Sequence, residues 1–163
     1  MERKMRRFRQ QLPDDEARRI LADTTNGILS LVDTDGTPYG VPLSYVYDGD
    51  HTIYMHSARS GRKIDCLRHN PAASFCVVVR DDILPEQFTT LFVSVIASGT
   101  VTIIDDEAET VRGLRMLADK YSLGIDSTHE ITTQMRNVLT LRMDIEAITG
   151  KESIELTRER PAK

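Results

Sequence analysis

The sequence predicts a mainly β protein, a small antiparallel barrel with helices at its periphery. Three observations favour this fold class: the chain contains six segments with strand-like patterns, most connections between them are short, and only three segments have a clear helical pattern. A doubly wound parallel sheet would need a helical crossover between most pairs of strands. The pattern therefore excludes that alternative.

Length and charge limit the classes of protein that the chain can belong to. Its 163 residues are enough to bury a core, and we predict a single domain over residues 1–163 with a core of about residues 14–155. The net charge of −4 argues against nucleic acid as a partner. The basic arm, residues 1–9, lacks the apolar region of a signal peptide, and no segment reaches transmembrane length. We predict a cytoplasmic protein that has no membrane contact.

The cysteines and histidines give no metal motif. Cys66 and Cys76 form no CxxC pair and are expected to be reduced thiols, with Cys76 in a buried strand. The remaining candidates are the four histidines, which have no metal-ligand spacing with the cysteines. We predict that there is no metal site.

The first half of the chain predicts one helix followed by a three-stranded meander. An amphipathic helix is expected over Asp14–Asp23, because it begins with acidic residues and has a regular apolar face. Strands are expected over Gly27–Asp33, Tyr39–Tyr47 and His51–His56, and the Asp35-Gly36 pair between the first two is a strong hairpin signal.

Pro42 lies inside the second of these strands. Proline cannot donate a ladder hydrogen bond, so its position is an edge, a bulge or a place where a ligand approaches the backbone. Gly40, two residues earlier, also lacks bulk. The pair favours a ligand lying against the strand, and a plain edge strand is the alternative.

The second half predicts two more helices and three longer strands. Residues 72–80 are apolar on both faces and should form a central strand, whereas residues 81–87 should form a polar loop. Gly99 indicates a bulge in the next strand. The other expected elements are a helix over Ser60–His69 capped by Ser60, strands over Leu91–Ile104 and Val138–Lys151, a helix over Asp106–Tyr121, a loop with a short helix over Ser122–Met135, and a frayed tail over Arg158–Lys163.

The helix predicted at Ser60–His69 begins with an unusual charge order. Arg59, Arg62 and Lys63 crowd its start, where the helix dipole and free N–H groups favour an anion. The helices predicted at Asp14 and Asp106 both begin with acidic residues. A bound phosphate explains the inversion, and a solvated basic turn is the alternative.

Several motifs, in this order, resemble those of a known family. The segment Val41–Tyr45 is followed by Tyr54–Ala58, by Gly61-Arg62-Lys63, by Phe92–Val95 running into Gly99, and by Ile148–Lys151. Together they resemble the flavin-binding split-barrel superfamily. Within it they are most similar to the pyridoxamine 5′-phosphate oxidase-like group that includes the nitroimidazole-resistance (Nim) proteins. The resemblance covers about residues 20–151.

The resemblance implies a six-stranded Greek-key barrel that forms a homodimer and holds FMN, in preference to FAD, in a cleft between the subunits. It implies that the cofactor phosphate lies on Ser57, Arg62 and Lys63. The remaining cofactor-binding residues implied are Val41, Pro42, Leu43 and Ser44 along the flavin ring, and Ser94 and Lys151 near it from either subunit.

His56 has two interpretations. By resemblance it lies at the substrate or cofactor end of the cleft as the candidate catalytic residue, and otherwise it is a strand-end histidine that bonds a phosphate or a backbone carbonyl. Strand alternation puts it on the same face as Tyr54. His51, His69 and His129 are expected to be surface residues. Tyr45, Tyr47 and Tyr54 are expected to pack inside the barrel, with a place for one of them beside the flavin ring as the alternative.

The implied function is an FMN-dependent oxidoreductase that acts on a small molecule, with a nitroaromatic among the candidates. The alternatives are a non-catalytic carrier of flavin, haem or deazaflavin with the same fold, and an inert barrel with a solvated basic turn. True pyridoxamine-phosphate oxidases end in an arginine-rich segment that grips the substrate phosphate. Residues 158–161 match that segment weakly and have no tryptophan near them, which argues against vitamin B6 oxidation.

Overall fold

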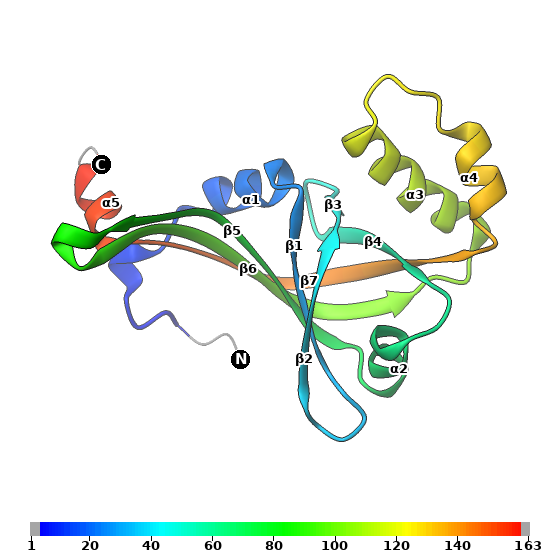
Figure 1. Cartoon of the computed structure of the whole chain (residues 1–163), viewed down its shortest axis with the longest axis horizontal. Coiled ribbons are helices and arrows are strands. Elements are labelled where there is room, and N and C mark those ends of the chain that lie inside the picture. The colour runs from blue at the N-terminus through cyan, green and yellow to red at the C-terminus, as the bar shows by residue number, and fades with distance from the viewer. Residues whose placement is uncertain (1–3, 161–163) are drawn as a thin grey trace.

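In the computed structural model, which describes residues 4–160, seven strands form one antiparallel sheet in the order β2-β1-β5-β6-β7-β4-β3 (Figure 1). The strands are β1 (Asn26–Val32), β2 (Pro38–Ser44), β3 (Val46–Tyr47), β4 (Thr52–Ala58), β5 (Ala72–Leu84), β6 (Thr89–Ile103) and β7 (Val138–Glu152). The helices are α1 (Asp14–Asp23), α2 (Arg62–His69), α3 (Glu107–Tyr121), α4 (Thr128–Gln134) and α5 (Ile154–Glu159), and the 3-10 turns are η1 (Phe8–Gln10) and η2 (Pro85–Gln87). The predicted mainly β class with peripheral helices is confirmed.

The strand predicted over Tyr39–Tyr47 is broken at Tyr45. β2 pairs with β1, whereas β3 pairs with β4, and the two strands therefore lie at opposite ends of the sheet order. Tyr45 is fully buried, its hydroxyl donates to the Leu21 carbonyl at 2.6 Å, and its ring packs edge-on against Phe75. One buried residue thus carries the chain from one end of the sheet to the other, and the six predicted extended segments become seven strands.

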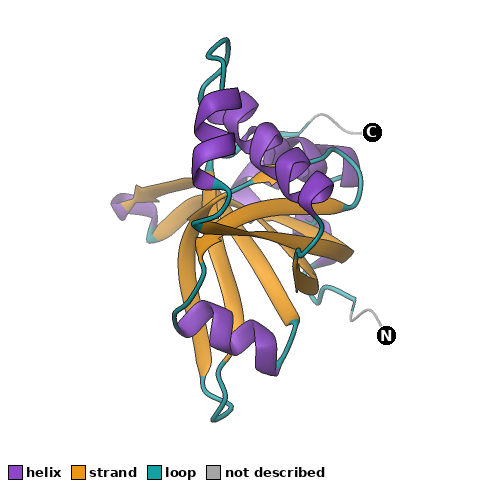
Figure 2. Ribbon diagram, turned by 90° about the vertical axis from the view of Figure 1, so that its right-hand side faces the viewer, coloured by secondary structure: helices purple, strands orange, loops and turns teal. Residues whose placement is uncertain are grey.

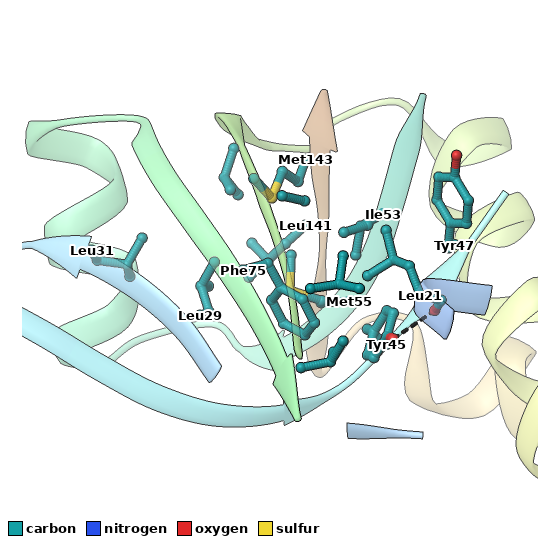
Figure 3. Packing of buried hydrophobic residues seen from close by; sticks show 14 of the residues in the cluster. Leu21, Leu29, Leu31, Tyr45, Tyr47, Ile53, Met55, Phe75, Leu141 and Met143 are labelled. Atoms are coloured by element: carbon teal, nitrogen blue, oxygen red, sulfur yellow. Dashed lines mark hydrogen bonds between the residues drawn. The ribbon is translucent and has the colours of Figure 1, made fainter. Parts of the chain in front are cut away.

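The core lies on the inward faces of the strands (Figure 3). Ile53 and Met55 of β4 and Leu141 and Met143 of β7 alternate with outward residues and are completely buried. The α1 helix covers one side of this core with Leu21. Fully burying one such aliphatic side chain contributes about 1.5–3 kcal/mol, so this continuous cluster is the main source of stability.

The predicted bulge at Gly99 is present. The pairing of β6 with β7 shifts register between Ser98 and Gly99, and a Cβ atom on Gly99 would lie 2.0 Å from the carbonyl oxygen of Asp144. No side chain fits between two backbones at that distance. Glycine is therefore required where β6 bends across β7.

The polar loop predicted over residues 81–87 is wrong. β5 continues to Leu84, and Asp81 and Asp82 pair with Phe92 and Leu91 of β6. This part of the hairpin extends beyond the body of the sheet (Figure 1). A two-stranded ribbon has no buried face that demands alternating apolar residues, and for that reason its sequence resembles a loop.

The start of α2 and the C-terminal tail also differ from expectation. Ser60 was expected to cap α2, but the cap is Gly61, which has φ +121° and provides no side-chain hydrogen bond. The tail was expected to fray, but as far as Arg160 it forms α5 and an ion-pair cluster. Arg160 binds Glu16 and Glu152 with N–O distances of 2.7 Å. Residues 1–3 of the predicted arm and 161–163 of the predicted tail lie outside the described part.

The start of α3 provides a first prediction. The Asp106 carboxylate accepts a hydrogen bond from the Glu109 amide at 2.7 Å, which caps the helix. Asp106→Ala should therefore lower the free energy of unfolding by about 1 kcal/mol, measured by urea denaturation. Asp105→Ala is the matched control, because Asp105 is exposed and precedes the cap. Equal losses in the two variants would contradict the capping role.

Candidate functional site

A cavity of about 560 Å³ lies between the sheet and the helices α3 and α4. In Figure 1 these two helices lie together at the end of the sheet opposite the β5–β6 hairpin tip, and Figure 2 shows α2 on the other side of the strands. The volume is typical of small-molecule sites. The lining residues include two predicted site residues, Ser44 of β2 and His56 of β4.

His56 reaches this cavity because of the alternation along β4. Ile53 and Met55 point into the main core, whereas Tyr54 points outward and packs with Val46 and Leu117 under α3. His56, two residues beyond Tyr54, lies where α3 no longer covers the strand, and its side chain remains exposed to the cavity. The prediction that His56 shares a face with Tyr54 is confirmed.

The start of α2 follows β4 directly. Of the three cations here, Arg62 has an acidic partner within the chain, because its guanidinium lies 2.6 Å from Asp33 and stacks on Tyr39 at 4.4 Å from the ring centre. Arg59 instead donates to the Arg136 and Val138 carbonyls at 3.4 and 3.3 Å. Among residues 4–160, Lys63 has neither a hydrogen-bond nor an ion-pair partner.

The positive charge of Lys63 acts on His56. Burial lowers the pKa of His56, and the positive charge of nearby Lys63 lowers it further. Burial also lowers the pKa of the Lys63 ammonium group. The site thus combines a neutral histidine with a partly desolvated cation, an arrangement that an added anion would stabilise.

These shifts predict how His56 titrates. Lys63→Ala should raise the pKa of His56 only part of the way to its ordinary value, because burial is the larger cause. The titration of the His56 ring, followed by ¹H–¹³C NMR, measures the change, and Arg68→Ala at the far end of α2 is the control. A pKa that moves equally in both variants would contradict a local interaction.

The same shift has a consequence for stability. The folded state disfavours protonated His56, so this residue contributes stability above its unfolded pKa, and that contribution is lost as the pH falls through the lower folded pKa.

The outward side of the sheet carries the other predicted residues. Pro42, Ile28, Cys76, Ile96 and Thr149 are cross-strand partners in succession and form one row over five strands. We call this row, together with its neighbouring row of small residues, the outer face. The neighbouring row consists of Gly40, Ser30, Ser74, Ser98 and Ala147. The outer face is therefore apolar along one row and nearly free of bulk along the next.

Within β2 the predicted flavin contacts divide between the two sides of the sheet. Val41 and Leu43 are half-buried against the main core, whereas Pro42 and Ser44 are exposed. β2 is an end strand of the sheet order, so Pro42 occupies an edge. Ser57, one residue after His56, is 5 % exposed on the same side as Met55.

Ser94 and Lys151 are direct partners across β6 and β7, and the Lys151 ammonium lies 5.2 Å from the centre of the Phe92 ring. Lys151 lies far along β7 from Thr140, the partner of His56 in β4, roughly 36 Å at the rise of an extended strand. One chain therefore groups Ser44, His56 and Lys63 near one another and leaves Ser94 and Lys151 elsewhere on the outer face.

The helical wall of the cavity was missed by sequence reasoning. Leu114, Leu117, Ala118 and Tyr121 of α3 all line it, and their spacing of three and four residues marks one helix face. The apolar residues of α3 extend further round the helix than contact with the sheet requires. This wide apolar face is visible in the sequence and could have indicated a second contact surface. The remaining lining residues are Ser127, Glu130, Ile131, Gln134 and Val138.

Other candidate chemistries find little support in the described residues. Within residues 4–160, no group of three or more His, Cys, Asp or Glu side chains could hold a metal ion. No helix in the same range is long and apolar enough to cross a membrane. Cys66 is buried, whereas Cys76, expected in a buried strand, is half-exposed on the outer face, and burial raises the pKa of both thiols.

The comparisons with known proteins agree with this fold. Residues 13–152 match the family described as "Pyridoxamine 5′-phosphate oxidase". A comparison with curated proteins finds no match.

Three solved structures illustrate the similarity. A candidate 5-nitroimidazole antibiotic resistance protein from Bacteroides thetaiotaomicron has a TM-score of 0.77 at 22 % identity, over 87 % of this chain and 86 % of that one. An FAD-binding protein from Mesorhizobium loti has a TM-score of 0.65 at 25 % identity, over 88 % and 96 %. An FAD and heme binding protein from Mycobacterium smegmatis has a TM-score of 0.73 at 19 % identity, over 88 % and 73 %.

Proposed function

The chain belongs to the pyridoxamine 5′-phosphate oxidase family, and from this premise we propose that it binds a flavin and acts as a flavin-dependent oxidoreductase on a small molecule. The observation that carries the proposal is Lys63. It is a half-buried cation at the start of α2, without an acidic partner among residues 4–160, next to the cavity that holds His56 and Ser44.

The residues at the start of α2 fit a flavin phosphate. Gly61 leaves the approach open, since a Cβ atom there would meet no atom within 4 Å. No side chain caps the helix, so its first amides are available to an anion. We propose that Lys63 and these amides hold the phosphate, assisted by Ser57 and by Arg62, which would share its charge with Asp33.

The edge of β2 suits the ring of the same cofactor. Gly40 and Pro42 are exposed there, Gly40 has no side chain to block an approach, and Ser44 lines the cavity. We propose that the ring lies along Val41–Ser44 and that His56 contacts the cofactor or the substrate. A bound flavin supplies electron transfer itself, so the site needs neither a catalytic triad nor paired carboxylates. The proposed site at the start of α2 holds one phosphate group. FMN carries one phosphate group, so the site favours FMN over FAD.

The outer face supports a homodimer. Near the middle of the sheet, Val78 of β5 is 59 % exposed and Ile96 of β6, opposite Cys76, is 44 % exposed. Apolar side chains that stay exposed on neighbouring central strands are typical of a protein contact. We propose that a second copy covers it and that Ser94 and Lys151 then approach the cofactor of the partner.

The C-terminal segment argues against a phosphate-bearing vitamin B6 substrate. Arg160 donates to both carboxylate oxygens of Glu16 and of Glu152 over 2.7–2.8 Å. Its guanidinium is fully engaged in joining α1, β7 and the tail. It is therefore not available to grip a substrate phosphate.

The proposal is tested by the absorbance spectrum of the purified protein before and after incubation with excess FMN and removal of unbound flavin. Retained flavin bands, followed by bleaching on addition of NADH or NADPH, are the expected result. The second candidate is a carrier, favoured by fold neighbours whose descriptions name binding alone. Retained flavin that no donor reduces would favour this carrier, and a Soret band would favour haem. A colourless protein would contradict both.

A further inference from the structure

The wall of the cavity formed by α3 and α4 is mainly apolar. Leu117 and Ile131 are almost fully buried there, and Leu114 and Ala118 are half-buried. Gly113 marks the side of α3 that faces the sheet, because a Cβ atom on it would lie 2.8 Å from both Tyr54 and Thr140. Leu117 lies one turn from Gly113 on that side and packs with Val46 and Tyr54. Leu114, Ala118 and Tyr121 extend the apolar surface round the helix and into the cavity.

The charge of the cavity has one sign. Among the described residues that line it, Glu130 of α4 is the one carboxylate, and none is a lysine or an arginine. The other polar lining groups are Ser44, Tyr121, Ser127, Gln134 and His56, and the lowered pKa of His56 favours its uncharged form. An anion in this cavity would thus meet a carboxylate and no cation, whereas an amine would meet a counter-charge.

Lys63 does not change this balance. It lies close enough to His56 to act on it, but it does not line the cavity. In the proposed flavoprotein the phosphate of the cofactor neutralises it. The α3–α4 wall is thus left with the negative charge of Glu130.

We propose that this cavity binds a neutral or cationic, largely apolar small molecule, with Glu130 facing the positive charge, and that it disfavours anions. The assignment of this molecule as the substrate rests on the proposed flavin-dependent function. The selection by charge does not depend on that function. Phosphorylated substrates, which the family description suggests, are disfavoured in this cavity by the same argument.

Three probes of one shape test the selection: 2-naphthylmethylamine, 2-naphthylmethanol and 2-naphthoate. Binding to the full chain, first incubated with excess FMN and freed of unbound flavin, is measured by isothermal titration calorimetry. The amine should bind about tenfold more tightly than the naphthoate, with the alcohol between them. Weaker discrimination than in a buried site is expected because Glu130 is solvent-exposed.

Substitutions test whether residues of the α3–α4 wall cause the selection by charge. Glu130→Gln should remove the advantage of the amine over the alcohol without changing the affinity for the alcohol, and Glu130→Lys should invert the order of amine and naphthoate. Asp119→Asn is the matched control, since this exposed acid of α3 does not line the cavity. Ala118→Phe, checked for folding by circular dichroism, should abolish binding of all three probes by filling the cavity.

The outcomes separate this inference from the proposed function. Naphthoate binding as tightly as the amine, no binding of any probe, or an Asp119→Asn effect equal to that of Glu130→Gln would each overturn the charge selection. Flavin retention is read by absorbance in the same samples. Retained flavin with no selection contradicts the cavity inference alone, and selection without retained flavin contradicts the flavin proposal alone.

Discussion

Lys63→Ala is expected to weaken flavin binding by roughly 30-fold, because it removes a charge-assisted contact to the phosphate from a partly desolvated position. The measurement is fluorescence quenching of FMN titrated with apoprotein. The fold should be retained, since Lys63 makes no contact with another charged group among residues 4–160 and its side chain is only half-buried.

Two variants of the same helix provide the controls. Arg68→Ala removes a cation from the last turn of α2 and should leave flavin affinity within about twofold. Arg62→Ala should have a smaller effect on flavin than Lys63→Ala, because its charge is already balanced by Asp33. If Arg62→Ala proves the more damaging, or if Lys63→Ala retains full affinity, the phosphate does not lie where α2 begins.

Ile96→Asp is expected to raise the dissociation constant of the proposed homodimer by roughly a thousandfold. Ile96 lies in the middle of the apolar row of the outer face, between Cys76 and Thr149. A two-fold interface would bury the new carboxylate twice, once in each subunit, without a partner. Light scattering coupled to size-exclusion chromatography measures the change from dimer to monomer.

Thr132→Asp is the control for this substitution, since Thr132 is exposed on α4 and lies outside both the outer face and the cavity lining. Loss of flavin together with loss of the dimer would support a cofactor cleft completed by the second copy. An Ile96→Asp variant that remains dimeric would place the interface on another surface.

Local patterns were sufficient to predict much of the fold. The helix Asp14–Asp23 was predicted with its observed bounds because amphipathic spacing and an acidic start agree there. The clean alternation after Val138 predicted β7 to within one residue. Gly99 marked the bulge because a close approach of two backbones leaves glycine as the residue that fits.

The features that sequence reasoning missed depend on distant partners. The pairing of Arg62 with Asp33 joins the start of α2 to the end of β1, and no spacing rule connects the two. The break at Tyr45 separates two strands that pair with different partners, β1 and β4, so it depends on distant segments and leaves no local signal. At the candidate site, strand alternation predicted the orientation of His56, whereas the cavity beside it depends on how α3 and α4 pack.

The order of the strands has a consequence for how the chain is made. β1 and β2 can pair as soon as both leave the ribosome, but β4 must wait for β7, because Thr52–Ala58 bonds to residues near the C-terminus. Until then a nascent chain presents an unpaired edge at β4, with the inward faces of Ile53 and Met55 open to water. Long-range pairing of this kind slows folding and exposes intermediates to aggregation. Ribosome-bound chains that end before Val138 should therefore be the ones that recruit chaperones.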